Sequence, residues 1–216
     1  MILRVNEIFH SIQGESSHAG MPCVFVRLTG CNLRCSWCDT RYAYEEGETI
    51  LIRDILERVR AFQCRLVEVT GGEPLLQVGT SELVNSLLSE HYTVLVETNG
   101  SLDIRLVDPA CSRIVDMKCP SSGMADRNEL RNLEFLTERD ELKFVIGSRE
   151  DYEFAVRFLD SIRSGWGTPS YTINFSPVFS AVSPRILAEW ILHDRLPVRL
   201  NLQLHKILWD PDARGV

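Results

Sequence analysis

The chain has 216 residues, 44% of them hydrophobic, and a formal net charge of −7 at pH 7. This length and composition predict one domain over residues 1–216 with a substantial buried core. The acidic balance argues against general nucleic-acid binding, and no apolar run approaches the length of a membrane span. We also find no basic-then-apolar leader at the N-terminus, so we expect a cytoplasmic protein that binds neither nucleic acid nor membrane.

Short runs of β-branched and apolar residues predict a series of strands along the chain. We expect them at residues 24–28, 66–69, 93–96, 113–117, 142–146, 171–175 and 198–202. Several runs are apolar almost throughout, as buried parallel strands are. Amphipathic patterns between some of the runs predict four helices. Three of them begin at Thr49, Ser81 and Ser183, and the other has an apolar stripe from Tyr152 to Ile162. This alternation indicates βαβ units and a parallel sheet.

Two connections depart from the regular alternation. Residues 99–112 and 120–141 are too short or too broken for full crossover helices, apart from a turn or two around residues 128–136. We therefore expect an α/β fold in the form of a partial, open (β/α) barrel with reduced helix content. Ligands bind at the C-terminal ends of parallel strands in such folds. Polar or glycine-rich motifs follow the predicted strands at Cys31, at "TGGEP" (70–74), "ETNG" (97–100), "DMKCPSSG" (116–123) and "SPV" (176–178).

The segment "GCNLRCSWCDT" (30–40) places three cysteines in a C-x3-C-x2-C pattern. A structural zinc site needs four ligands, and no second C-x2-C or H-x3-H pair is present to supply them. His18, His205 or Cys23 could complete a zinc site, which leaves a non-catalytic zinc module as one interpretation. A [4Fe–4S] cluster has four irons, so three cysteines would leave one iron open to another ligand.

The cysteine spacing, with Trp37 directly before the last cysteine, and the downstream "TGGEP" resemble the radical S-adenosylmethionine superfamily. The resemblance implies a core domain that binds a [4Fe–4S] cluster through Cys31, Cys35 and Cys38, and S-adenosylmethionine through the open iron. Gly71 and Gly72 would let backbone groups approach the methionine ammonium, and Glu73 would add negative charge. The full set of implied cofactor contacts is Trp37, Gly71, Gly72, Glu73, Glu97, Asn99, Lys118, Pro120, Ser121, Ser176, Pro177 and Val178. Core packing is the alternative role for Trp37.

Within that superfamily, "VNEIFHSIQGESSHAG" (5–20) and the tail "LQLHKILWDP" resemble the 7-carboxy-7-deazaguanine synthase family. The family converts 6-carboxy-5,6,7,8-tetrahydropterin by a Mg²⁺-dependent radical ring contraction with loss of ammonia, in queuosine and 7-deazapurine biosynthesis. The resemblance implies an N-terminal substrate-binding segment before the first strand and a C-terminal closing segment. It places substrate contacts at Ile12, Gln13, Gly14, Glu15, Arg27, Thr70 and His205, and a Mg²⁺ ligand at Thr40.

The resemblance also implies partners, which are a flavodoxin or ferredoxin as electron donor and a second copy of the chain in a homodimer. Other roles stay open for two residues, because Thr40 could be a turn hydroxyl and His205 an exposed histidine. The nearest enzyme alternative is a small glycyl-radical-enzyme activase, which has the same cysteine spacing. Such an activase would leave the "SIQGE" and "HKILW" segments without a purpose.

Overall fold

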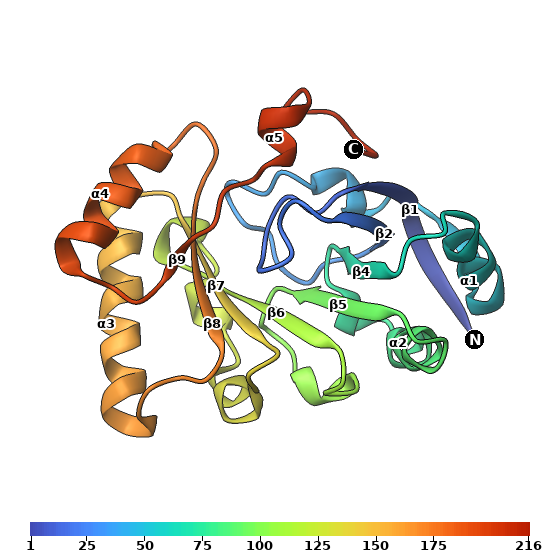
Figure 1. The fold of residues 1–216 in the computed structure, drawn as a ribbon, viewed down its shortest axis with the longest axis horizontal. Coiled ribbons are helices and arrows are strands. Elements are labelled where there is room, and N and C mark those ends of the chain that lie inside the picture. The colour runs from blue at the N-terminus through green and yellow to red at the C-terminus, as the bar shows by residue number, and fades with distance from the viewer.

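The computed structural model describes residues 1–216, apart from the side chain of Trp166. Its strands join in one nine-stranded sheet in the order β3-β1-β2-β4-β5-β6-β7-β8-β9 (Figure 1). Neighbouring strands from β2 to β9 are parallel, whereas β1 is antiparallel to β2 and β3. The strand bounds are β1 Ile2–Ile12, β2 Pro22–Leu28, β3 Glu48–Leu51, β4 Leu66–Gly71, β5 Thr93–Thr98, β6 Ser112–Met117, β7 Glu141–Ile146, β8 Thr172–Pro177 and β9 Arg199–Leu200.

Helices lie beside the two ends of the sheet, and no α-helix lies in the connections on either side of β6. Figure 1 shows α1 and α2 beside the strands at one end and α3 and α4 at the other. The connections on either side of β6 contain only short 3-10 turns, among them Ile104–Leu106 and Leu130–Phe135. The predicted open α/β fold with reduced helix content is therefore confirmed. The α-helix bounds are α1 Ile52–Ala61, α2 Gly79–Ser89, α3 Arg149–Trp166, α4 Pro184–Asp194 and α5 His205–Leu208.

The start of α1 differs from the prediction. Thr49 lies in β3, where it pairs with Arg4 of β1, and the cap position of α1 is Leu51 without a side-chain hydrogen bond. Strand pairing at the edge of the sheet has overridden the local capping preference of threonine. Ser183, by contrast, is the cap residue of α4 and Pro184 is its first residue, as predicted.

The prediction that residues 5–20 precede the first strand is wrong for the first part of that segment. Residues 2–12 form β1, whose Phe9 pairs and stacks with Phe25 of β2 at 5.0 Å between ring centroids. Polar residues such as Glu7 and His10 interrupt the apolar pattern of this segment, so the pattern does not predict a strand there. The loop that follows, residues 13–20, leads directly into β2.

The inward faces of the strands change from apolar to polar along their length. A small apolar group made of Cys23, Phe25, Leu66, Leu95 and Ile114, with Phe9 against it, fills the interior at one level; we call it the apolar floor. The next inward positions on β2 and β4 are Arg27 and Glu68, because side chains alternate between the two faces of a strand. A polar interior thus begins toward the C-terminal ends of the strands.

Among the described residues, none of the helices has the length and apolar character of a membrane span.

Candidate active site

A cavity of about 390 Å³ opens at the C-terminal ends of the parallel strands. Most of the residues singled out from the sequence line it, including the three cysteines and the segment after β1. Glu73, Pro120 and Ser121 lie outside its lining. The predicted residues in the lining are Ile12, Gln13, Gly14, Glu15, Arg27, Cys31, Cys35, Trp37, Cys38, Thr40, Thr70, Gly71, Gly72, Glu97, Asn99, Lys118, Ser176, Pro177, Val178 and His205.

The cysteine loop fits an iron–sulfur cluster in its donors and surroundings. All three thiols are free and half-buried, and the Sγ of Cys31 accepts contacts from the Leu33 N–H at 3.4 Å and the Asn99 amide at 3.6 Å. Burial raises the pKa of the Cys35 thiol, while the nearby Lys118 ammonium lowers it. Within the described residues, no group of three His, Cys, Asp or Glu side chains is gathered to hold a single metal ion.

The two glycines of "TGGEP" allow two segments of the chain to pack closely against each other. A Cβ at Gly71 would lie 2.1 Å from the Leu28 carbonyl oxygen, and one at Gly72 would lie 2.1 Å from the Gly30 carbonyl oxygen and 2.9 Å from the Cys31 Cβ. Gly71 also has a φ of +137°, which side chains disfavour. The sequence interpretation assigned these glycines only to the approach of a ligand. The structure shows that they first allow the approach of β2 and the cysteine loop.

Glu73 has a structural environment that differs from the prediction. Its carboxylate is fully buried and accepts hydrogen bonds from the Leu75 N–H, the Thr98 hydroxyl and the Asn99 N–H. These donors satisfy a carboxylate that would otherwise be costly to bury. Glu73 therefore ties the "TGGEP" turn to the "ETNG" turn behind the cavity wall, and its side chain does not add charge at the cavity surface as we expected.

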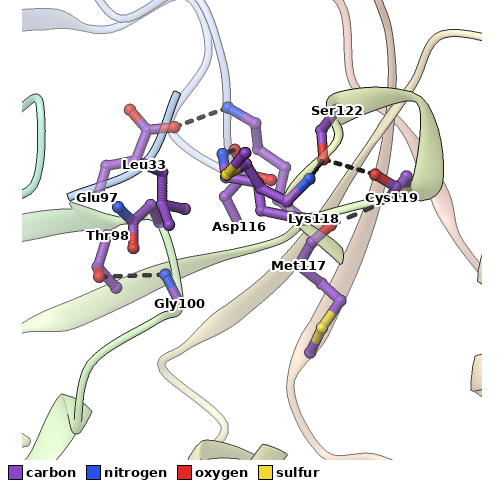
Figure 2. A network of polar contacts seen from close by, with 12 residues as sticks. Leu33, Glu97, Thr98, Gly100, Asp116, Met117, Lys118, Cys119 and Ser122 are labelled. Carbon is purple, nitrogen blue, oxygen red and sulfur yellow. Dashed lines mark hydrogen bonds and ion pairs between the residues drawn. The ribbon is translucent and has the colours of Figure 1, made fainter. Parts of the chain in front are cut away.

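The end of β6 supplies an ion pair to the cavity. Lys118 Nζ lies 2.6 Å from Asp116 Oδ2 and 5.7 Å from the centroid of the Trp37 ring, while Glu97 of β5 lies nearby (Figure 2). Trp37 lines the cavity and donates its indole N–H to the Ser121 hydroxyl at 3.1 Å, so it is not a core residue. The other Asp116 oxygen, Oδ1, is buried without a hydrogen-bond partner in the described residues. An acceptor of this kind suits a polar ligand such as S-adenosylmethionine.

Lys143 and Glu68 are cavity residues that the sequence interpretation missed. The buried Lys143 Nζ lies 2.6 Å from the partly buried Glu15 and 2.6 Å from the partly buried Glu97, whose carboxylate also accepts from the Thr70 hydroxyl at 3.2 Å. Burial alone would lower the pKa of Lys143, but the two carboxylates raise it well above its ordinary value. Glu97 is thus bound to a lysine of β7, not placed solely for a cofactor. Both residues stand in apolar strands, where the sequence does not separate an inward polar position from an exposed one.

Arg27 lies on the cavity wall with a partner already in place. Its Nε donates to Glu7 at 2.7 Å, and its guanidinium lies between the rings of Phe9 and Tyr42, 5.8 and 5.9 Å from their centroids. A guanidinium has five N–H donors in a planar fork, so one bond to Glu7 leaves others available. The aromatic pair and Glu7 therefore orient the group toward the cavity and leave it able to bind an anion.

Thr40 and the tail lie at the rim of the cavity. The Thr40 hydroxyl donates to Asp39 at 2.9 Å, and Asp39 accepts from Lys206 Nζ at 2.8 Å. These oxygens fit Mg²⁺, which keeps several waters and needs few protein ligands. His205 packs against Gly14 so closely that a Cβ there would lie 2.2 Å from the His205 Nδ1. Burial lowers the pKa of His205, which favours a neutral imidazole at neutral pH.

Known proteins are similar to this chain along almost its whole length. A family model described as the Radical SAM superfamily matches residues 25–118. The 7-carboxy-7-deazaguanine synthase of Chlorobaculum tepidum is 50% identical over 99% of this chain and 97% of its own length. The enzyme of that name from Koribacter versatilis is 43% identical over 99% of this chain and all of its own length.

Among solved structures, QueE from Escherichia coli matches with a TM-score of 0.73 and 25% identity, over 94% of each chain. The similarity therefore includes the N-terminal segment and the tail as well as the cysteine loop. It sets aside the zinc-module and glycyl-radical-activase interpretations, because neither accounts for relatives of one name along the full length. The chain belongs to the 7-carboxy-7-deazaguanine synthase family of the radical S-adenosylmethionine superfamily.

Proposed function

We propose that this protein converts 6-carboxy-5,6,7,8-tetrahydropterin to 7-carboxy-7-deazaguanine with release of ammonia. The observation that carries the proposal is the full-length similarity to synthases of that name, combined with one cavity that brings the cysteine loop and a charged interior together. When bound, a [4Fe–4S] cluster and S-adenosylmethionine supply the radical chemistry, and the protein supplies binding and orientation.

The cavity divides these tasks between its two ends. Cys31, Cys35 and Cys38 would hold the cluster, and Trp37 with the Lys118–Asp116 pair would border S-adenosylmethionine. The deeper part, above the apolar floor, would take the pterin. There Arg27 is oriented to bind the substrate carboxylate through its planar fork, which suits two-point recognition. Ile12, Gln13, Gly14, Glu15, Thr70 and His205 are the remaining proposed substrate contacts.

Mg²⁺ is part of the proposal, with Thr40 as its protein ligand. A hydroxyl alone is a weak ligand, so the substrate carboxylate and water would complete the octahedral shell. The neighbouring Asp39 carboxylate adds negative charge beside the proposed ion. Metal and substrate should therefore strengthen each other's binding. The cytoplasmic location, the single-domain organisation, the homodimer and a flavodoxin or ferredoxin as electron donor also stay predictions.

The test is anaerobic reconstitution with iron and sulfide, followed by incubation with S-adenosylmethionine, Mg²⁺, a chemical reductant and the pterin. We expect a product with the mass of 7-carboxy-7-deazaguanine and an equal amount of ammonia. Cleavage of S-adenosylmethionine without consumption of the pterin would contradict the proposed substrate. Omission of the pterin gives the matched control for uncoupled cleavage.

A further inference from the structure

The charged side chains of the cavity are paired, with one exception. Lys143 contacts Glu15 and Glu97, Lys118 contacts Asp116, Lys206 contacts Asp39, and Arg27 contacts Glu7. Glu68 of β4 also lines the cavity and is only 4% exposed. Among the described residues, it forms no ion pair with any lysine or arginine. Glu68 is therefore a buried carboxyl group without a cation.

Glu68 uses one of its two oxygens within the protein. Gln13 donates its side-chain N–H to Glu68 Oε2, and the Gln13 side-chain oxygen Oε1 accepts from the Glu15 N–H at 3.0 Å. Glu68 Oε1 accepts no hydrogen bond from the described residues and is not among their fully buried, unpartnered atoms. This second oxygen is therefore open to the cavity.

An unpaired carboxyl in this place is costly for folding. Removing a carboxylate from water without a cation is strongly unfavourable, and an apolar residue of similar volume would be a more stable choice. Burial, and then the charge of Glu97, raise the pKa of Glu68 well above its ordinary value. Such a cost is understandable where a ligand provides the missing partners, because buried acceptors and ligand donors then satisfy each other.

The position of Glu68 points to the pterin as that ligand. On β4 it follows Leu66 of the apolar floor and precedes Thr70, so it faces the deep end of the cavity. The neighbouring carboxylates already have partners, because Glu15 accepts hydrogen bonds from Lys143, Asn201 and Gln203, and Glu97 accepts from Lys143 and Thr70. A reduced pterin carries an amino group and several ring N–H donors. We propose that Glu68 is a substrate-binding residue that accepts hydrogen bonds from these amino and ring N–H donors.

This inference rests on the proposed function and adds a consequence for protons. The charged groups that act on Glu68 are Glu97, Lys143 and Glu15. The other charged side chains of the cavity are Arg27, Asp39, Asp116, Lys118 and Lys206. Donors from the substrate favour the ionised carboxylate, whereas the empty cavity favours the protonated form. Substrate binding should therefore release up to about one proton wherever free Glu68 is still protonated.

The experiment compares wild type with Glu68→Gln, using cluster-loaded enzyme with S-adenosylmethionine and no reductant. Glutamine keeps the shape and still accepts from Gln13, but it removes the charge. We expect the Kd for 6-carboxy-5,6,7,8-tetrahydropterin to rise about 10- to 100-fold, the size of a lost charge-assisted hydrogen bond. The Kd for S-adenosylmethionine should stay unchanged, and the melting temperature should be equal or higher. Glu57→Gln, an exposed substitution on α1, is the matched control.

An unchanged Kd for the pterin, or a lower melting temperature as the sole effect, would overturn the inference. Calorimetry of wild type in two buffers of different ionisation enthalpy gives a second measurement, which remains available if Glu68→Gln does not fold. Proton release on pterin binding supports the inference, and its absence contradicts it. Product formation by wild type is measured in parallel. Failure of that reaction refutes the proposed function, whereas a normal reaction with unchanged Glu68→Gln binding refutes only the role of Glu68.

Discussion

Glu15 and Lys143 are 128 positions apart in the sequence, yet their charged groups lie 2.6 Å from each other inside the cavity. The pair joins the loop after β1 to the middle of β7. Glu97 shares the same ammonium at 2.6 Å, so one buried lysine holds two partly buried carboxylates. The position of Glu15 therefore depends on a residue on the far side of the sheet.

Lys143→Met should lower the free energy of unfolding by about 1–3 kcal/mol, between the values for exposed and buried pairs, because it leaves two partly buried carboxylates without their cation. Urea denaturation followed by circular dichroism measures this change. Arg185→Met is the control, since it breaks an exposed pair with Glu189 and should have no measurable effect. A loss below about 1 kcal/mol for Lys143→Met would mean that the contacts of Lys143 with the two carboxylates do not stabilise the fold.

The carboxyl of Glu68 should make stability depend on pH. Its pKa is raised in the folded protein, mainly by burial, so its favourable contribution is complete below the unfolded value of about 4.5. That contribution is lost as the pH rises through the folded pKa. The free energy of unfolding of wild type should therefore fall relative to Glu68→Gln over this range. If the free energies of unfolding of the two proteins changed with pH in the same way, ionisation of the Glu68 carboxyl would not destabilise the fold, which would contradict this prediction.

Replacement of Cys31, Cys35 or Cys38 by alanine should abolish cluster binding. Iron and sulfide analysis and visible absorbance after anaerobic reconstitution measure the loss. Cys64→Ala provides the control, because this half-buried thiol lies outside the cavity lining and contacts the Pro22 carbonyl oxygen at 3.3 Å. Equal loss of the cluster in a Cys23 or Cys119 variant would disprove the three-cysteine assignment.

Arg27→Lys should reduce kcat/KM for the pterin by roughly 10- to 100-fold, since lysine keeps the charge and loses the planar fork. Steady-state kinetics at saturating S-adenosylmethionine measure the effect. Glu7→Gln tests whether the orientation of Arg27 contributes to kcat/KM, because Glu7 orients Arg27 through the 2.7 Å contact with Nε. Unchanged kinetics for Arg27→Lys would assign the arginine to packing between Phe9 and Tyr42.

Thr40→Val should depress turnover and remove its dependence on Mg²⁺, because valine keeps the shape and lacks the oxygen ligand. Activity is measured against Mg²⁺ concentration in metal-depleted buffer. Cluster absorbance should be the same in both proteins. Coincident activity curves would leave Thr40 as the donor to Asp39 and move the metal elsewhere in the site.

The parallel strands and the glycine-rich turns could be predicted from the sequence. Buried strands consist of continuous apolar runs, and these turns contain glycine. Strand β1 could not, since it carries polar residues such as Glu7, whose partner, Arg27 of β2, is 20 positions away in the sequence. Glu68 and Lys143 were missed for the same physical reason. An ionisable residue inside an apolar strand looks alike whether it faces water or a polar interior, and the partners that distinguish the two are far away in sequence.

The contact between Gly14 and the tail has a consequence for the order of folding. The Leu204 N–H donates to the Gly14 carbonyl oxygen at 3.0 Å, and the next residue, His205, packs on Gly14. A contact that closes almost the entire chain carries a large loop-closure entropy and forms late, after the neighbouring strands have paired. We therefore expect the amides of residues 203–206 to exchange with solvent deuterium faster than those of β4 and β5. Transient separation of these end segments would give ligands a way into the cavity while the sheet stays folded.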